Sequence, residues 1–306
     1  MKEINLPYID ARFYVDFEKP FSFATSPAIV FRSILGCRLK KLSCLAPRSK
    51  CPNCQFHKTC VYAVIFETII EKDTDFLSGR DKGSHPFRFK VDKPVPLKTP
   101  LTHFAISIQL YGFAVQYLPY IFYALREAGQ EGLFKEKAVF HIRKVMVDEM
   151  NILHADGTLQ TNFAVHIWQY PKAPSEYETH ITKNVRIVSP LRFKVHGKYS
   201  VNFSAQDFLY CIHRRLITLC SLYGKYKSDE LYHPSDTLTI TNRKLMWQDY
   251  DYHSHRQNAK IKMGGIVGSF CLTGTREAYD AALLDFAGIF GAGKNTNFGL
   301  GNLIIT

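Results

Sequence analysis

The secondary structure that hydrophobic periodicity predicts has the same order in both halves of the chain, and this repetition restricts it to few folds. In the first half we expect a strand at 10–17, a helix at 24–41, strands at 87–94 and 101–112, a helix at 115–130 and a strand at 138–150. Residues 61–70 are apolar and β-branched, which suits either a strand or a buried helical turn.

The second half repeats this order. We expect a strand at 185–195, a helix at 204–224, strands at 236–252 and 263–274, a helix at 276–291 and a strand at 300–306. Ser204 and Asp207 are placed as the N-cap and first-turn acid of the first of these helices. Each half therefore has the β-α-β-β-α-β order of a ferredoxin-like fold.

The sequence thus predicts an α+β protein with two tandem ferredoxin-like, RRM-like domains. We expect the domains at 1–170 and 176–306, with a Pro- and Ser-containing linker at 171–175. Ferredoxin-like sheets often present a face to RNA, although a fold alone says little about function.

Positive charge is large and clustered. Lys and Arg total 39 against 27 Asp and Glu, which gives a net charge of +12. No acid occurs at 19–66 or at 252–276, and Asp207 is the one acid at 179–228. An ordinary solvated surface intersperses both signs, so these stretches indicate a polyanionic partner. Charge alone does not separate a nucleic acid from an acidic membrane surface.

Two location signals are missing from the sequence. No apolar run approaches the roughly 20 residues that cross a bilayer, and the first 17 residues carry acids and no apolar signal-peptide core. We therefore expect a cytoplasmic protein without a membrane partner. In that compartment, eight cysteines indicate a metal or redox site rather than a disulfide framework.

A cysteine-rich loop at 44–60 contains half of these cysteines. Cys44, Cys51, Cys54 and Cys60 lie within 17 residues, with a central C-x2-C spacing. Four thiolates suit tetrahedral zinc, and four free thiols would be unusual in so polar a loop. We expect a structural zinc ion, with an iron–sulfur cluster as the alternative.

A glycine-rich segment at 288–301 precedes the last predicted strand. Its glycines and the polar residues between them are Gly291, Gly293, Gly299, Gly301, Lys294, Asn295 and Asn297. Glycines let backbone N–H groups approach a phosphate, and Lys adds charge. A Walker A loop does not fit, because Asn295 stands where Ser or Thr should hold magnesium and the order is helix, loop, strand.

Taken together, these motifs resemble a known family. They are Trp247, the stretch 252–257, the glycine strand 264–268, the helix and tail around Gly291, Ser189-Pro190-Leu191, the helix with Arg214-Arg215, and the cysteine loop closed by Cys60-Val61-Tyr62. The chain is similar to the CRISPR-associated endoribonucleases of the RAMP superfamily, the family numbered six among the Cas proteins.

This resemblance implies metal-independent cleavage of the repeats in a CRISPR precursor transcript, with no cofactor for catalysis and no small-molecule substrate. It also implies that the glycine-rich loop contacts RNA. Cleavage by the 2′-hydroxyl leaves a 2′,3′-cyclic phosphate and a 5′-hydroxyl, and it needs a base, an acid and donors to the phosphate.

Histidines are the candidates for the proton transfers. His253 and His255 would share a face of a strand, with Tyr252 beside them. The family's catalytic histidine often lies near the first helix, where this chain has none before His57. His57 is therefore a further catalytic candidate, and His85 is a weaker one.

The candidate RNA-binding residues are basic, or belong to the glycine-rich loop. They are Gly291, Gly293, Lys294, Asn295, Asn297, Gly299, Gly301, Arg256, Lys260, Lys262, Arg214, Arg215, Lys40 and Lys41. Two other functions stay open: a non-catalytic RAMP-type crRNA-binding subunit, with other CRISPR effector subunits as partners, and a metal or redox protein built on the cysteine loop. Cleavage of repeat RNA in the presence of a chelator would distinguish an enzyme from the non-catalytic subunit.

Overall fold

The computed structural model of this chain describes residues 3–70, 82–91, 95–134, 136–170, 180–228, 231–249, 251–254 and 259–306, with the backbone alone for 251–254 and 259–262. The chain divides into two compact units. Pro7–Ile167 form the N-terminal unit, and Trp168–Thr306 form the C-terminal unit together with Met1–Leu6.

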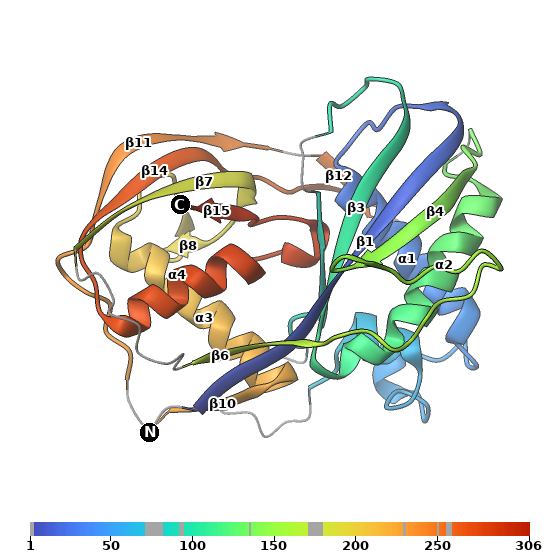
Figure 1. Cartoon of the computed structure of the whole chain (residues 1–306), viewed down its shortest axis with the longest axis horizontal. Coiled ribbons are helices and arrows are strands. Elements are labelled where there is room, and N and C mark those ends of the chain that lie inside the picture. The colour runs from blue at the N-terminus through green and yellow to red at the C-terminus, as the bar shows by residue number, and fades with distance from the viewer. Residues whose placement is uncertain are drawn as a thin grey trace. The chain divides into compact units, whose positions relative to one another are not determined.

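The N-terminal unit has the ferredoxin-like order of elements (Figure 1). They are β1 (Glu3–Phe21), α1 (Pro27–Ser43), β2 (Phe87–Lys90), β3 (Leu101–Tyr111), α2 (Leu118–Glu131) and β4 (Phe140–Val147). The sheet runs β2-β3-β1-β4 in antiparallel pairs and is extended by β5 (Met150–Asn151). Alternate residues of β1, such as Ala11, Phe13 and Val15, are buried in the core.

The C-terminal unit repeats the arrangement. Its elements are β7 (His180–Leu191), α3 (Ala205–Tyr223), β11 (Thr239–Gln248), β14 (Gly265–Thr275), α4 (Ala278–Phe290) and β15 (Leu303–Ile305). The antiparallel sheet order is β11-β14-β7-β15, the same strand order as in the first unit. Both α3 and α4 pack on one face of this sheet (Figure 1). The predicted fold class, two tandem ferredoxin-like folds, is confirmed.

Both units also contain short helices and strands. They are the 3-10 helices η1 (Cys51–Asn53), η4 (Gly112–Tyr117) and η5 (Thr296–Phe298), the π-helical turn η2 (Ala63–Glu67), and the strands β6 (His166–Tyr170), β8 (Lys194–Val195), β9 (Lys198–Tyr199), β10 (Lys225–Lys227), β12 (Asp251–Ser254) and β13 (Ala259–Lys262).

Several local predictions can be compared with these elements. Within the segment 61–70, Ala63–Glu67 form the helical turn η2, so the helical alternative is correct for these residues. Pro119 lies in the first turn of α2, where its missing N–H is tolerated. At α3, the Ser204 hydroxyl accepts from the Asp207 N–H and Asp207 reaches back to the Ser204 N–H, which completes the predicted cap. The predicted linker 171–175 lies outside the described residues.

One feature of β1 is not evident from the sequence. Its first residues, Glu3–Asn5, pair with β10 within the C-terminal unit. Close packing accompanies this pairing, because a Cβ at Gly224 would lie 2.1 Å from the Asn5 carbonyl oxygen. The N-terminal residues therefore belong structurally with the second unit.

Candidate RNA-binding surface

The glycine-rich loop joins α4 to β15, and backbone hydrogen bonds hold it against the end of β7. The Lys294 N–H donates to the Arg192 carbonyl at 2.8 Å, and the Gly301 N–H donates to the Pro190 carbonyl at 2.9 Å. Within the loop, the Ala292 N–H donates to the Gly301 carbonyl at 2.9 Å. These N–H groups are therefore used inside the protein.

The glycines at 293 and 301 are required by this packing. Both have a positive φ, +79° and +71°, a backbone conformation that residues other than glycine rarely adopt. A Cβ would lie 2.6 Å from the Arg192 carbonyl oxygen at Gly293, and 1.9 Å from the Ala292 carbonyl oxygen at Gly301. The two glycines thus have a structural role, and their contact with RNA remains a prediction.

Lys294 and Asn295 are the exposed polar residues of the loop tip. Asn297 is buried, and its side-chain nitrogen has no hydrogen-bond partner among the described residues. Gly291 ends α4 as its C-cap, and Gly299 closes η5, both with positive φ. The loop therefore presents one flexible cation to solvent on a rigid backbone.

The two adjacent arginines of α3 have different surroundings. Arg214 is exposed, as a phosphate contact requires. Arg215 is 6% exposed, and its Nε donates to the Phe290 carbonyl at 3.0 Å, which ties α3 to the end of α4. The structure therefore gives Arg215 a packing role that the sequence pattern did not reveal.

The histidine-containing segment begins in the hairpin β12–β13. Its backbone register places His253 opposite Lys260, Tyr252 opposite Ile261 and Asp251 opposite Lys262. The predicted residues His255 and Arg256 lie outside the described residues. Strand geometry at Tyr252 and His253 agrees with the expected extended backbone, and the catalytic roles stay predictions.

The cysteine loop begins where α1 ends and is organised by short backbone turns. The Cys44 N–H donates to the Lys40 carbonyl at 3.0 Å, and the Cys54 N–H donates to the Cys51 carbonyl at 3.2 Å. His57 is half-buried, and its Nδ1 lies 2.8 Å from the Cys54 carbonyl oxygen, which fixes the ring against the loop. His57 is thus a tethered residue of the loop.

The four thiols of the cysteine loop are the candidate ligands of a metal ion. Within the residues that the structure describes, no three His, Cys, Asp or Glu side chains are grouped to hold a metal ion. Burial raises the pKa of the Cys51 thiol, and Glu67, Cys44 and Cys60 raise it further. Lys40 opposes this rise, and a metal ion that bound the loop would itself displace the thiol protons. The zinc ion therefore remains a prediction.

The two lysines at the end of α1 are exposed but engaged. Lys41 Nζ lies 3.1 Å from Glu131 Oε1 on α2, and Lys40 Nζ lies 5.6 Å from the centre of the Tyr62 ring. Both contacts are weak at an exposed surface, so either amine can still reach a phosphate.

His85, the weaker catalytic candidate, is half-buried beside two aromatic rings. It contacts Phe66 and Phe87 edge-on. Burial of the ring, together with the positive charges of Arg32 and Lys82, lowers its pKa to about 3. His85 is therefore neutral at physiological pH, with its Nε2 atom shielded from solvent, an environment typical of a structural histidine.

Sequence reasoning missed a hairpin that follows β7. The predicted strand 185–195 ends in fact at Leu191, and β8 and β9 form a separate two-stranded sheet. Their connection, His196-Gly197, has positive φ at both residues, as tight two-residue hairpins require. A His-Gly pair between short alternating segments was the available signal.

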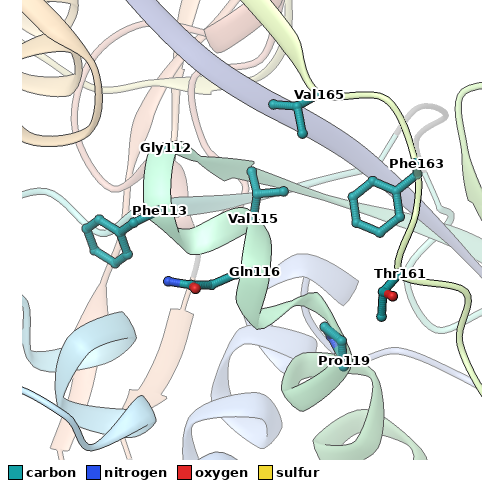
Figure 2. A pocket seen from close by; sticks show the side chains of 8 residues that line it. All are labelled: Gly112, Phe113, Val115, Gln116, Pro119, Thr161, Phe163 and Val165. Atoms are coloured by element: carbon teal, nitrogen blue, oxygen red, sulfur yellow. The ribbon is translucent and has the colours of Figure 1, made fainter.

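A pocket of about 360 Å³ lies in the N-terminal unit beside η4 (Figure 2). Its walls are mostly apolar and come from Gly112, Phe113, Val115, Gln116, Pro119, Thr161, Phe163 and Val165. None of these residues carries a charge, so the pocket offers no cation to a phosphate. It also contains none of the predicted catalytic residues.

Comparisons with known proteins agree with this description. Residues 6–165 match the model AF_1859_N, described as an N-terminal domain, and residues 185–303 match the model of the CRISPR-associated endoribonuclease Cas6. An uncharacterized protein of Archaeoglobus fulgidus is 24% identical over 296 residues, covering 89% of this chain and 88% of that protein.

Solved structures share the fold. A Cas6 product complex has a TM-score of 0.52 at 14% identity, with 98% of this chain and 100% of that chain covered. A chain of a partial Cas6–RT–Cas1–Cas2 complex has a TM-score of 0.56 at 13% identity, with 98% of this chain and 46% of that chain covered.

Two ferredoxin-like units with a glycine-rich loop before the last strand define a RAMP-type CRISPR-associated protein. Within that class, residues 185–303 belong to the family of the CRISPR-associated endoribonuclease Cas6, and residues 6–165 belong to the AF_1859_N family of N-terminal domains. The family match supports an RNA-cleaving enzyme that processes or binds CRISPR RNA. Among the described helices, none is both long and apolar enough to cross a membrane.

Proposed function

We propose that this protein is a metal-independent endoribonuclease that cleaves the repeats of CRISPR precursor RNA. The observation that carries the proposal is the match of residues 185–303, which contain the glycine-rich loop, to the endoribonuclease Cas6. The 2′-hydroxyl would attack the adjacent phosphate, leaving a 2′,3′-cyclic phosphate and a 5′-hydroxyl. This route needs proton transfer and charge stabilisation and no metal-bound water.

Residues of the C-terminal unit would supply these needs. His253 and His255 would act as base and acid, because an imidazole titrates near neutral pH. Tyr252 would add a hydrogen bond to the reacting groups, and Lys294 and Arg256 would stabilise the charge on the phosphate. If the histidines of this segment have no role, His57 is the next candidate.

The proposal also concerns partners and cofactors. Repeat RNA is the substrate, and a relative solved with RT, Cas1 and Cas2 makes other CRISPR proteins reasonable partners. The protein would act in the cytoplasm, where a precursor transcript is accessible. Cys44, Cys51, Cys54 and Cys60 would hold a structural zinc ion once the thiols are deprotonated.

The test is a cleavage assay in excess EDTA. End-labelled repeat RNA from the host's own array is incubated with the wild-type protein and with a His253→Ala/His255→Ala variant. His103→Ala is the matched control, because His103 is an exposed histidine of β3 outside the proposed site. We expect one cut with a cyclic-phosphate end, lost in the double variant and kept in the control.

The other outcomes are equally informative. A cut that persists in the double variant moves catalysis to another residue, and His57→Ala is then the next variant. Tight, salt-sensitive binding without a cut would show that the protein is a non-catalytic crRNA-binding subunit and not an enzyme. Cleavage that requires a divalent cation contradicts the metal-independent mechanism.

A further inference from the structure

The hairpin β8–β9 forms a small basic and aromatic surface on the C-terminal unit. Residues 192–199 contain no acid, and Lys194, Lys198 and Tyr199 are exposed. The tight turn at 196–197 holds the two strands in register, with Lys194 opposite Tyr199. The short hairpin therefore projects cations and a ring together, in place of a continuous strand.

The ring of Tyr199 is the centre of this surface. The Arg192 guanidinium carbon lies 4.2 Å from its centre, and Lys194 Nζ lies 5.6 Å away. The ring of Trp247, on β11, lies 5.8 Å from Tyr199 at a tilt of 45°. Tyr199 is 38% exposed, so part of the ring faces solvent. We call Arg192, Tyr199 and Trp247 the Tyr199 platform.

Hydrogen bonds fix the platform in place. Arg192 Nη1 donates to the Gly264 carbonyl at 2.6 Å, and Trp247 Nε1 donates to Asp249 Oδ1 at 2.8 Å. Gly264 lies so close to the indole that a Cβ would be 2.6 Å from Trp247 Nε1. A ring system that is already immobilised loses little entropy when a ligand stacks on it.

The platform is continuous with the glycine-rich loop. The Arg192 carbonyl accepts a hydrogen bond from the Lys294 N–H. This backbone contact joins the platform to the loop tip, where Lys294 is exposed. Lys194 Nζ lies 5.6 Å from the Tyr199 ring, Lys198 is exposed on the same hairpin, and Lys294 is exposed on the loop whose backbone contacts Arg192. Amines beside an aromatic surface are the combination that binds single-stranded nucleic acid, through phosphates and base stacking.

We propose that the Tyr199 platform stacks an unpaired base of the repeat RNA while the neighbouring lysines hold its phosphates. This inference rests on the proposed function for its ligand, and it assigns recognition to residues outside the cleavage chemistry. Stacking tolerates any base, so the platform selects single-stranded RNA over a closed duplex rather than a particular sequence.

The test measures binding of fluorescently labelled single-stranded repeat RNA by anisotropy over a range of salt concentrations. Loss of one stacked base weakens binding by roughly 5- to 150-fold, so we expect a loss in this range for Tyr199→Ala, with an unchanged salt slope. Tyr199→Phe keeps the ring and should bind as the wild type does. Lys198→Ala should lower the salt slope by about 0.7 with a small effect on affinity.

A matched control and a spectroscopic signal make the test specific. Tyr120 is an exposed tyrosine of the N-terminal unit, 52% exposed, and Tyr120→Ala should leave RNA binding unchanged. The chain has two tryptophans, and Trp168 is buried, so RNA should quench the fluorescence of Trp247 selectively. In Trp247→Phe the RNA-induced quenching should disappear.

Three results would overturn the platform: wild-type affinity in a folded Tyr199→Ala variant, an equal loss in Tyr120→Ala, or wild-type quenching by a duplex of the same repeat. Circular dichroism establishes whether each variant is folded, and Tyr199→Phe tests the ring if Tyr199→Ala does not fold. Failure of the wild-type protein to bind repeat RNA would refute the proposed function itself, which distinguishes the two failures.

Discussion

Replacing Arg215 tests whether the adjacent arginines of α3 have the different roles that their surroundings indicate. Arg215 is 6% exposed and donates to the Phe290 carbonyl, whereas Arg214 is exposed. A hydrogen bond from a charged group contributes about 1.5–3 kcal/mol, and the buried stem of the side chain adds packing. We expect Arg215→Ala to lower the free energy of unfolding by about 2–4 kcal/mol.

The assays are urea unfolding and thermal unfolding, both followed by circular dichroism, with RNA affinity measured in parallel. At roughly 2–4 °C per kcal/mol, Arg215→Ala should lower Tm by roughly 4–16 °C. Arg215→Met keeps an apolar stem, so it should lose the hydrogen bond to Phe290 and keep the packing, a loss of about 1.5–3 kcal/mol. Arg214→Ala is the matched control and should change stability by less than about 0.5 kcal/mol.

In RNA binding we expect the reverse: Arg214→Ala should have an effect and Arg215→Ala should not act through the RNA. Arg214→Ala should lower the salt slope of RNA binding by about 0.7 if the exposed guanidinium contacts a phosphate of single-stranded RNA. Equal stability of Arg215→Ala and Arg214→Ala would refute the packing role. Loss of RNA affinity in Arg215→Ala without loss of stability would also refute the packing role, because the Arg215 guanidinium would then contact the RNA.

Three further predictions follow from other sites. Gly301→Ala adds a Cβ 1.9 Å from the Ala292 carbonyl oxygen at positive φ, so it should destabilise by more than about 1 kcal/mol in urea unfolding. Gly288→Ala is its control, because nothing lies within 4 Å of that Cβ, and a destabilisation as large as that of Gly301→Ala would contradict the argument. The pKa of His85 is lowered to about 3 from 6.5, so between these values the unfolded chain binds the proton and stability falls as pH falls. His85→Phe should reduce the loss of unfolding free energy between pH 7 and pH 5, and an unchanged loss would show that His85 does not cause it. Purified protein should contain about one zinc per chain, and chelation or Cys54→Ser should lower Tm. Metal analysis that finds no metal, or an iron–sulfur absorption band, would exclude zinc.

The order of elements could be predicted from the sequence because each half has strong local periodicity. The cap of α3 depends on residues three apart, Ser204 and Asp207, so it is also visible locally. Where the local signal was ambiguous, tertiary packing decided. Within the apolar segment 61–70, Ala63–Glu67 form a helical turn, with Ala63, Ile65 and Phe66 buried in it.

Contacts between distant residues could not be predicted in the same way. The hydrogen bond from Arg215 to Phe290 joins positions 75 residues apart, and nothing next to Arg215 in the sequence distinguishes it from Arg214. The Tyr199 platform likewise combines residues from β9, β11 and the residue that directly follows β7. Arg192 and Tyr199 look like ordinary surface residues in the sequence, and nothing next to Trp247 shows that its ring lies near Tyr199.

The glycine-rich loop shows why a motif can be recognised correctly while its mechanism is inferred incompletely. The density of glycines suggested N–H groups that are open to a phosphate, yet the N–H groups of Lys294 and Gly301 donate to the carbonyls of Arg192, directly after β7, and of Pro190, at the end of β7. The glycines permit the close backbone contact that makes this anchoring possible. Since the anchored backbone fixes Lys294 beside Arg192, the rigid loop positions a side chain for RNA. We therefore expect Lys294→Ala to weaken RNA binding with stability unchanged, and Gly301→Ala to reduce both.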